Sequence, residues 1–272
     1  MDYSTFQREV WKFYREHARD LPWRKSITPY KILVSEIMLQ QTQVDRVQEK
    51  FRVFIKAFPT FRHLAMADTH SVLALWQGLG YNRRALSLQK SAKEITLRHK
   101  GKIPKTVEEL VSLPGIGPAT AGAILAYAFN DAQPFIETNI RRVYLHHFFP
   151  METNVSDQKI LRIIEQTIDR KNPREWHWAL MDYGSHLGKI MRRENPNRRS
   201  RHYTKQAAFT GSNRQVRGKI IKALIASPTL PVVKLSITTK TPKKRILGAL
   251  EGLIRDGLVA KKGTFISLIG KS

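Results

Sequence analysis

The feature that most constrains the fold is the hexapeptide Leu-Pro-Gly-Ile-Gly-Pro at residues 113–118. Helical patterns flank it at 106–112 and 120–129, and its prolines and glycines prevent either helix from continuing through it. The glycines lack a Cβ, so backbone N–H groups can approach a partner closely, and the second helix begins there with its free N–H groups. The segment therefore predicts an anion site suited to phosphate, with a simple helix–helix turn as the alternative.

The first 210 residues show further short helical patterns separated by Pro, Gly and Asn. These patterns cover 3–17, 29–41, 44–57, 69–76, 83–99, 139–148, 156–170 and 174–186. Strand-like alternation is scarce, which predicts an all-helical body. After residue 211 the pattern changes to an amphipathic helix at 213–224, a second helix after Pro242, and two strand-like segments at 258–260 and 264–268. This order predicts a small C-terminal winged-helix (α+β) domain.

The large positive net charge limits the kinds of partner that the protein can bind. Lys and Arg number 47 against 22 Asp and Glu, a net charge of +25, which indicates a polyanion, either nucleic acid or a membrane surface. No apolar run approaches the ~20 residues needed to span a bilayer, and the N-terminus lacks the pattern of a signal peptide. We therefore expect a cytoplasmic protein that binds nucleic acid, not a membrane.

Two basic regions are candidates for phosphate contact. Residues 186–222 contain eleven Lys and Arg and one acid, Glu194. This strip either contacts phosphate or is a solvated linker. Lys243 and Lys244 begin the second helix of the C-terminal domain, as in a recognition helix that enters a groove. The alternative for that helix is a basic protein-interaction surface.

Cysteine is absent from the chain. This excludes disulfides, thiol nucleophiles, and zinc or iron–sulfur sites held by thiolates. The nine histidines are scattered, so no metal site held by side chains is expected.

Glu36 stands alone within an apolar run at 32–39. Burial of a carboxylate is costly unless it is paired or protonated, and an apolar environment raises the carboxyl pKa. Glu36 is therefore a candidate general acid, and the alternative is a surface glutamate or one paired with an arginine such as Arg24. Gln40 and Gln41 follow, with amide groups suited to filling a gap in a DNA stack.

Glu137 precedes a basic helix. It or Thr138 can cap that helix, and a carboxylate there can also face a developing cation. Arg141 and Arg142 follow, as solvated helix residues or, near DNA, as phosphate ligands.

Together these segments resemble the MutY-type adenine-specific mismatch glycosylases, within the helix-hairpin-helix superfamily that includes endonuclease III. The resemblance covers roughly residues 6–190. It is carried by residues 21–24 (Leu-Pro-Trp-Arg), 29–31, 35–44 (Ser-Glu-Ile-Met-Leu-Gln-Gln-Thr-Gln-Val), 58–60, 75–81 (Leu-Trp-Gln-Gly-Leu-Gly-Tyr), the hairpin, 139–143 and 181–184.

The resemblance implies a two-lobed body at 1–210, with a hairpin-containing lobe at 25–135 and a second lobe formed by the N-terminal helix and 136–210. It implies that Glu36 protonates the departing purine and that Glu137 replaces the family's catalytic Asp. The base pocket would contain Trp23, Arg24 and Ala119. The residues implied to contact DNA are Gln40, Gln41, Tyr81, Leu113, Gly115, Gly117 and Thr120, with a bound Na or K ion at the hairpin backbone 113–117.

The sequence departs from the family pattern at Glu137, in the missing cluster cysteines and in the C-terminal domain, and Ala119 refines the expectation further. Ala119 stands where bifunctional relatives carry the Schiff-base Lys, so we expect base removal without strand cutting. The family's iron–sulfur cluster has no cysteine ligands here, so no cofactor is expected. The winged-helix domain at 211–272 replaces the domain that recognises 8-oxoguanine, which leaves the opposite base open.

The sequence thus predicts a monomeric, nucleoid-associated base-excision repair glycosylase that acts on double-stranded DNA with a mismatch or lesion. The leading hypothesis is hydrolytic removal of adenine opposite 8-oxoguanine or guanine. Two alternatives stay open, a glycosylase for thymine, uracil or a damaged pyrimidine, and a catalytically inactive DNA-binding protein.

Overall fold

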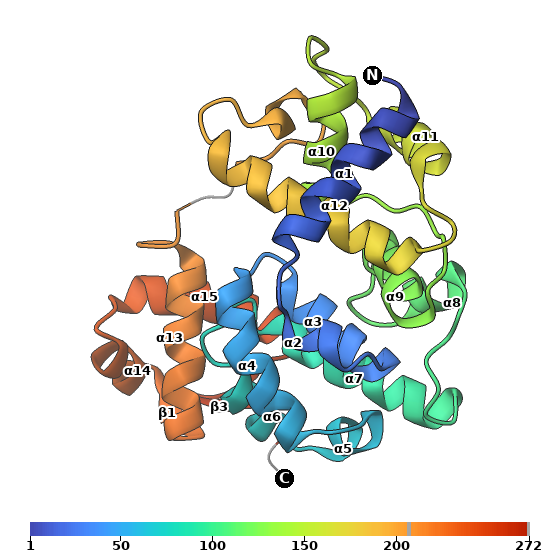
Figure 1. The fold of residues 1–272 in the computed structure, drawn as a ribbon. Coiled ribbons are helices and arrows are strands. Elements are labelled where there is room, and N and C mark those ends of the chain that lie inside the picture. The colour runs from blue at the N-terminus through green and yellow to red at the C-terminus, as the bar shows by residue number, and fades with distance from the viewer. Residues whose placement is uncertain (206–207, 271–272) are drawn as a thin grey trace. The chain divides into compact units, whose positions relative to one another are not determined.

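The computed structural model describes residues 1–205 and 208–270, and its described residues are mainly helical (Figure 1). This confirms the predicted helical body. The elements in chain order are α1 (Tyr3–His17), α2 (Pro22–Lys25), α3 (Pro29–Leu39), α4 (Val44–Ala57), α5 (Phe61–Met66), α6 (Thr69–Trp76), α7 (Arg83–Arg98), α8 (Val107–Ser112), α9 (Pro118–Phe129), α10 (Thr138–Phe148), α11 (Asp157–Thr167), α12 (Pro173–Ile190), η1 (Pro196–Arg199), α13 (Asn213–Ala226), β1 (Thr229–Pro231), α14 (Val232–Thr239), α15 (Lys243–Arg255), β2 (Val259–Lys262) and β3 (Phe265–Leu268).

The contacts divide the chain into two compact units. Unit 1 comprises Met1–Ile32, Lys105–Ser112 and Ile116–Lys205, and unit 2 comprises Leu33–Pro104, Leu113–Gly115 and the described chain after residue 205. The domain boundaries expected at residues 25, 135 and 210 stay predictions, because these units are defined by contacts alone.

Unit 1 is built around α12, which packs against α10, α1 and α9. Phe6 of α1 is fully buried, and its ring centroid lies 5.2 Å from that of Tyr144 and 5.9 Å from that of Trp176. Gly184 allows α12 to pass very close to α10, since a Cβ at this position would lie 2.2 Å from the carbonyl oxygen of Asn139.

The apolar run that begins at Leu33 is buried in unit 2. Leu33, Val34 and Met38 of α3 are fully buried. In the helical part of this unit, helices α4, α5, α6 and α7 pack on one another, with contacts between α5 and α7, α6 and α7, and α4 and α6. The long apolar run is therefore explained by the burial of α3.

The C-terminal part of unit 2, residues 213–268, contains three helices and a small antiparallel sheet with strand order β1-β3-β2. We call it the C-terminal module. Its helix α13 packs against α14, α15 and β3, and also against α6 of the helical part. Nε2 of His70 lies 2.9 Å from the carbonyl oxygen of Ile225, which joins α6 to the end of α13. The two strands and two helices predicted here are confirmed, and β1 and α14 are additional.

Several predicted helix ends differ from the structure: the helices predicted at 156–170 and 174–186 end at Thr167 and Ile190. One further boundary is wrong for a structural reason. The pattern at 29–41 predicts a helix to Gln41, whereas α3 ends at Leu39 because Gln41 has a left-handed backbone with φ 55°. Among the described residues, no helix has the length and apolar character that a bilayer-spanning segment requires.

Candidate active site

Glu36 lies on α3 between two buried neighbours, Ser35 and Ile37, and is itself half-buried. One turn further on, the side-chain amide of Gln40 donates a hydrogen bond of 3.2 Å to the carbonyl of Gly115. Gln41 follows, exposed and in its left-handed conformation. Unit 2 therefore brings the predicted acid, the predicted wedge glutamines and one hairpin glycine to the same end of α3.

A half-buried arginine that sequence reasoning missed, Arg84, organises this end of α3. Nη1 of Arg84 donates to the carbonyls of Ile37 (2.8 Å) and Met38 (2.9 Å), and also to the carbonyl of Gln40. These are carbonyls at the C-terminal end of a helix, where no further turn supplies N–H partners. The guanidinium thus caps α3 with a positive charge, which the helix dipole favours at this end.

The same guanidinium also holds the loop that carries Tyr81. Nη2 of Arg84 donates to the carbonyls of Leu79 (3.1 Å) and Gly80 (3.2 Å). Tyr81 has a left-handed backbone with φ 47°, which is uncommon for a residue with a Cβ and marks a locally constrained site. Burial lowers the pKa of Arg84 to about 10, so it remains charged at neutral pH. One cation therefore fixes both predicted wedge segments.

The hairpin glycines differ in what they contact. Gly115, with φ 82°, lies against α7, and a Cβ here would be 2.7 Å from Cβ of Ser87. The carbonyl of Pro114 accepts a 2.7 Å hydrogen bond from the Ser91 hydroxyl, and Leu113 is buried. Close backbone packing within unit 2 therefore requires Gly115.

In unit 1, Gly117 is the exposed N-cap of α9, with Pro118 in the first turn. Ala119 and Thr120 follow in that turn, and both are half-buried. Free N–H groups at such a helix start suit a phosphate oxygen. The phosphate and cation roles of the hairpin stay predictions.

The carboxylate of Glu137 caps α10 in unit 1. Its Oε1 accepts hydrogen bonds from the backbone N–H groups of Asn139 (2.5 Å) and Ile140 (2.7 Å). The predicted capping role is therefore confirmed, and Glu137 rather than Thr138 is the N-cap. Burial raises the pKa of the Glu137 carboxyl above its ordinary value. The two N–H hydrogen bonds and the charges of Arg142 and Arg141 lower it, but offset only part of the effect.

The raised pKa predicts how Glu137→Gln changes the pH dependence of stability. The folded state holds this proton more tightly than the unfolded state, whose pKa is about 4.3. The stability that protonated Glu137 contributes to the wild-type protein is therefore fully present below the unfolded pKa, and it is lost as pH rises through the higher folded pKa. Glutamine can keep the capping oxygen without the charge, so urea unfolding from pH 4 to 8 should show the variant gaining stability relative to wild type. Exposed Glu109 on α8 supplies the control, Glu109→Gln. Parallel pH curves for wild type and Glu137→Gln would contradict the prediction.

The arginines after Glu137 bind within unit 1. Arg141 forms a two-point ion pair with Asp157, with distances of 2.8 and 2.7 Å. Nη1 of Arg142 donates to the Asn139 side chain (2.9 Å) and to the carbonyl of Gly184 (2.5 Å). Phosphate contact by either arginine stays a prediction.

The predicted base-pocket residues Trp23 and Arg24 lie in unit 1, where Arg24 is held by Asp182, a carboxylate that sequence reasoning left without a role. Trp23 is 3% exposed. Arg24 donates to both oxygens of Asp182, each at 2.8 Å, and its guanidinium lies 5.1 Å from the ring centroid of Trp178. Arg19 donates to the same carboxylate from its backbone (2.9 Å) and its Nε (2.6 Å). In the sequence, Asp182 is marked only by the segment 181–184, which contributes to the family resemblance. Nothing near that segment indicates that Arg19 and Arg24 are its partners.

The residues present do not fit an iron–sulfur cluster. The chain has no cysteine, and within the described residues no three His, Asp or Glu side chains gather as metal ligands would. The segment around η1 is instead held by amide groups. Asn197 Nδ2 donates to the carbonyl of Thr138 at 3.0 Å, and Asn195 Oδ1 accepts from Arg142 Nε at 3.3 Å. Hydrogen bonding thus holds this basic segment in shape.

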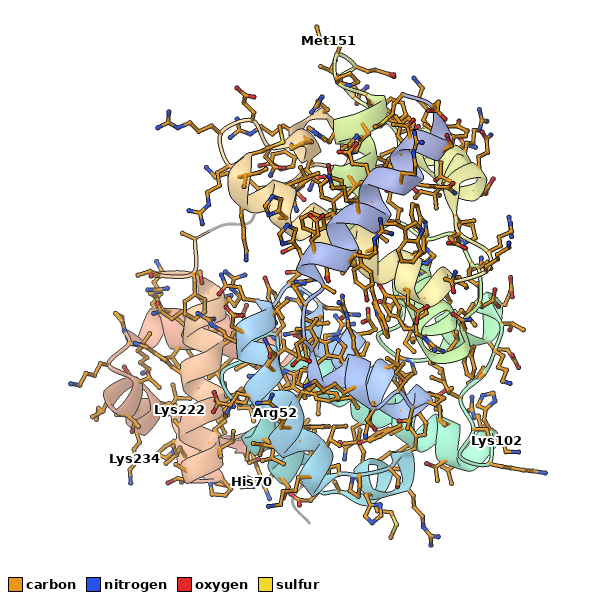
Figure 2. All side chains as sticks on the ribbon, viewed as in Figure 1. Arg52, His70, Lys102, Met151, Lys222 and Lys234 are labelled. Atoms are coloured by element: carbon orange, nitrogen blue, oxygen red, sulfur yellow. The ribbon has the colours of Figure 1, made fainter. Side chains whose placement is uncertain are left out.

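The cations of the C-terminal module include several exposed side chains. Lys243 and Lys244 in the first turn of α15 are exposed. Lys222 and Lys234 are exposed as well, and Figure 2 labels them on α13 and α14. DNA contact by Lys243 and Lys244 stays a prediction.

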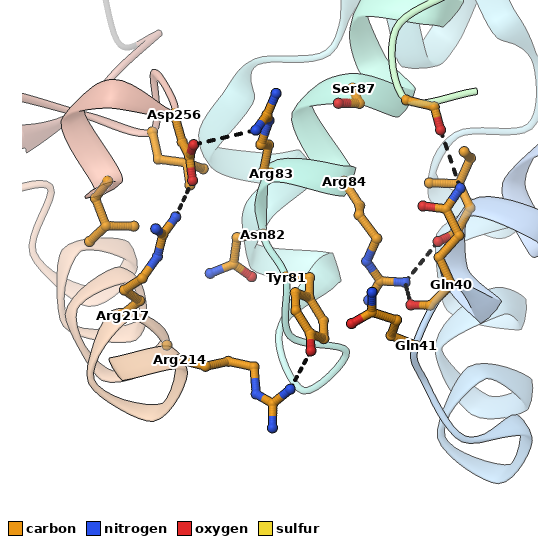
Figure 3. A pocket seen from close by; sticks show the side chains of 15 residues that line it. Gln40, Gln41, Tyr81, Asn82, Arg83, Arg84, Ser87, Arg214, Arg217 and Asp256 are labelled. Atoms are coloured by element: carbon orange, nitrogen blue, oxygen red, sulfur yellow. Dashed lines mark hydrogen bonds and ion pairs between the residues drawn. The ribbon is translucent and has the colours of Figure 1, made fainter. Parts of the chain in front are cut away.

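A cavity of about 480 Å³ within unit 2 adjoins the wedge residues (Figure 3). The helical part contributes Gln41, Tyr81 and Arg84, and the C-terminal module contributes Arg214 and Arg217, among others. Guanidinium groups thus face a cavity that sequence reasoning did not predict, because its two sides are far apart along the chain.

Comparison with known proteins identifies the class to which this fold and these residues belong. Residues 34–170 match the HhH-GPD superfamily of base excision DNA repair proteins. The fold resembles a thermostable thymine-DNA glycosylase (TM-score 0.60, 22% identity, covering 67% of this chain and 86% of that one). It also resembles endonuclease III trapped in a covalent intermediate with DNA (TM-score 0.54, 17% identity, covering 70% and 87%). The chain belongs to the HhH-GPD superfamily.

Within the superfamily, relatives named adenine DNA glycosylase match this chain. The protein from Mycobacterium tuberculosis strain H37Rv is 32% identical over 92% of this chain and 88% of its own length. A Buchnera aphidicola protein from strain Bp is 37% identical over 66% of this chain. The chain spans about half the length of that relative, 52%. The predicted resemblance to MutY-type proteins is therefore confirmed.

Proposed function

We propose that the protein is a DNA glycosylase that removes adenine mispaired with 8-oxoguanine or guanine. The observation that supports this most is the end of α3, the helix that carries Glu36. There Arg84 binds the carbonyls of Gln40 and Gly80, which directly precede the left-handed residues Gln41 and Tyr81. The names of the relatives supply the base. DNA as partner accords with the charge of +25 and with the endonuclease III neighbour, which was solved with DNA.

The proposed reaction is hydrolysis at C1′ of the adenine nucleotide. Glu36, as the carboxylic acid, gives its proton to the departing purine. Water then adds to the sugar cation and gives a proton to the Glu36 carboxylate, which restores the acid. The products are free adenine and an abasic site. The Glu137 carboxylate stabilises the cation, which in turn favours the ionised form of that buried group.

We also propose that the enzyme is monofunctional, so that it removes the base without cutting the strand. Ala119 offers no amine, so no Schiff base with the sugar forms at that position. We further propose that the protein is a monomer associated with the nucleoid in the cytoplasm, and that it needs no cofactor other than a monovalent cation at the hairpin backbone. The element order α13-β1-α14-α15-β2-β3 supports a winged-helix C-terminal module with α15 as its DNA-facing helix.

A duplex panel tests the proposed function. Purified protein is incubated with end-labelled duplexes that carry A opposite 8-oxoguanine, G or T, and with T·G and U·G duplexes. Alkali should break the strand at adenine in the first two duplexes, and omission of alkali should leave it intact. Release from T·G or U·G alone would identify a pyrimidine glycosylase, and tight binding without release from any duplex would identify an inactive DNA-binding protein.

A further inference from the structure

Tyr81 is contacted from two sides by arginines of different parts of unit 2. Its ring centroid lies 5.5 Å from the guanidinium carbon of Arg84 and 5.1 Å from that of Arg214. Arg214 is on α13 of the C-terminal module, and its Nη1 also donates to the Tyr81 hydroxyl (Figure 3). Both distances are within the range of a cation–π interaction. The aromatic side chain is therefore held at its ring and at its hydroxyl.

The C-terminal module also contacts the residues next to Tyr81. Asp256, at the end of α15, pairs with Arg217 of α13 and lies 3.7 Å from Nη1 of Arg83. Arg83 and Arg84 occupy the first turn of α7, directly after the Tyr81 loop. The module thus contacts the Tyr81 loop through a charged network as well as through Arg214, in addition to the contact between α13 and α6.

We propose that Arg214 is a positioning residue through which the C-terminal module orders Tyr81 for insertion into DNA. This inference rests on the proposed function. A side chain that is already ordered loses less conformational entropy when it inserts, so more of its contact energy is available for base flipping. Arg214 also places a positive charge beside the side chain proposed to enter DNA, and cations near DNA favour binding. The C-terminal module therefore has a direct part in engaging the lesion.

The test separates the flipping-and-release step from general DNA affinity. Arg214→Gln should lower the single-turnover rate of adenine release from an A·8-oxoguanine duplex, at saturating enzyme, by about tenfold. The dissociation constant for an undamaged A·T duplex should rise only by the modest factor that one lost charge causes. A merely structural role would not divide the effects in this way. Arg214→Lys, which keeps the charge and a donor, should recover part of the rate.

Two further variants show whether the effect runs through Tyr81. Exposed Lys234 lies on α14 of the same module, so Lys234→Gln is the matched control and should release adenine at the wild-type rate. In a double-mutant cycle, Arg214→Gln should cost less in the Tyr81→Phe background, since the hydroxyl contact is already lost. Circular dichroism checks that each variant is folded.

The outcomes distinguish the two proposals. A wild-type protein that releases no base contradicts the proposed function, and this inference with it. If the wild type is active and Arg214→Gln releases adenine at the same rate, the positioning role alone is contradicted. A faster Arg214→Gln variant would also overturn it, because the arginine would then restrain Tyr81 from reaching DNA. Additive effects in the cycle would show that Arg214 acts independently of Tyr81.

Discussion

Replacing Glu36 by glutamine is expected to lower the single-turnover rate of adenine release by about 10²- to 10⁴-fold, the usual contribution of a general acid. Glutamine has nearly the same shape and fits the half-buried position on α3, but it cannot give a proton to the leaving purine. Arg84 still caps the helix through backbone carbonyls, which the substitution does not alter. The loss should therefore appear in the chemical step.

The measurement is alkali-revealed strand cleavage at saturating enzyme, with duplex affinity determined in parallel. Affinity for the A·8-oxoguanine duplex should stay close to that of the wild type. Glu49 on α4 is exposed in the same unit, so Glu49→Gln applies the same change away from the site. An active Glu36→Gln variant, within tenfold of the wild-type rate, would exclude Glu36 as the acid.

The parts of the structure that were predictable from sequence are those determined by local pattern. The hairpin between α8 and α9 follows from its glycines and prolines, and the burial of α3 follows from the apolar run around Glu36. The capping role of Glu137 was also visible, because a polar side chain that precedes a helix commonly accepts its first N–H groups. In each case the determining residues lie within about one turn of the feature.

The missed features depend on residues distant in sequence or on packing that overrides propensity. Residues 232–239, Val-Val-Lys-Leu-Ser-Ile-Thr-Thr, are rich in β-branched residues yet form α14, because packing against α13 and α15 decides. The end of α3 at Leu39 depends on Arg84, which is 44 positions beyond Gln40. Arg214 lies 133 positions beyond Tyr81. No local pattern contains either contact.

Asp182→Asn is expected to destabilise the protein by about 3–5 kcal/mol, the cost of breaking a buried ion pair from one side. The Asp182 side chain is only 1% exposed, and its two oxygens accept all four hydrogen bonds from Arg19 and Arg24. An asparagine would direct an N–H₂ group at these donors and leave the Arg24 guanidinium, whose side chain is 9% exposed, without a counter-charge. The Tm should fall by about 10 °C.

The pH dependence of stability provides an independent test of the same variant. Burial raises the pKa of Asp182, but the hydrogen bonds from Arg24 and the charges of Arg24 and Arg19 outweigh it, so the pKa lies below its ordinary value. The stabilisation is thus fully present above the unfolded pKa of about 3.9 and is lost as pH falls through the folded value. Wild type should therefore lose more stability than Asp182→Asn on acidification, and the two unfolding curves should converge.

Asp20 is the matched control, because its pair with Lys25 at 2.7 Å joins two side chains that are 72% and 67% exposed. An exposed pair contributes little, so Asp20→Asn should leave the Tm unchanged. Asp182 and Asp20 both pair with basic side chains from residues 19–25, and the pairs of Asp182 are buried whereas the pair of Asp20 is exposed. A loss for Asp182→Asn no larger than about 1 kcal/mol would mean that solvent reaches Arg24, and that the arginine is not held in the fixed position expected of a base-pocket residue.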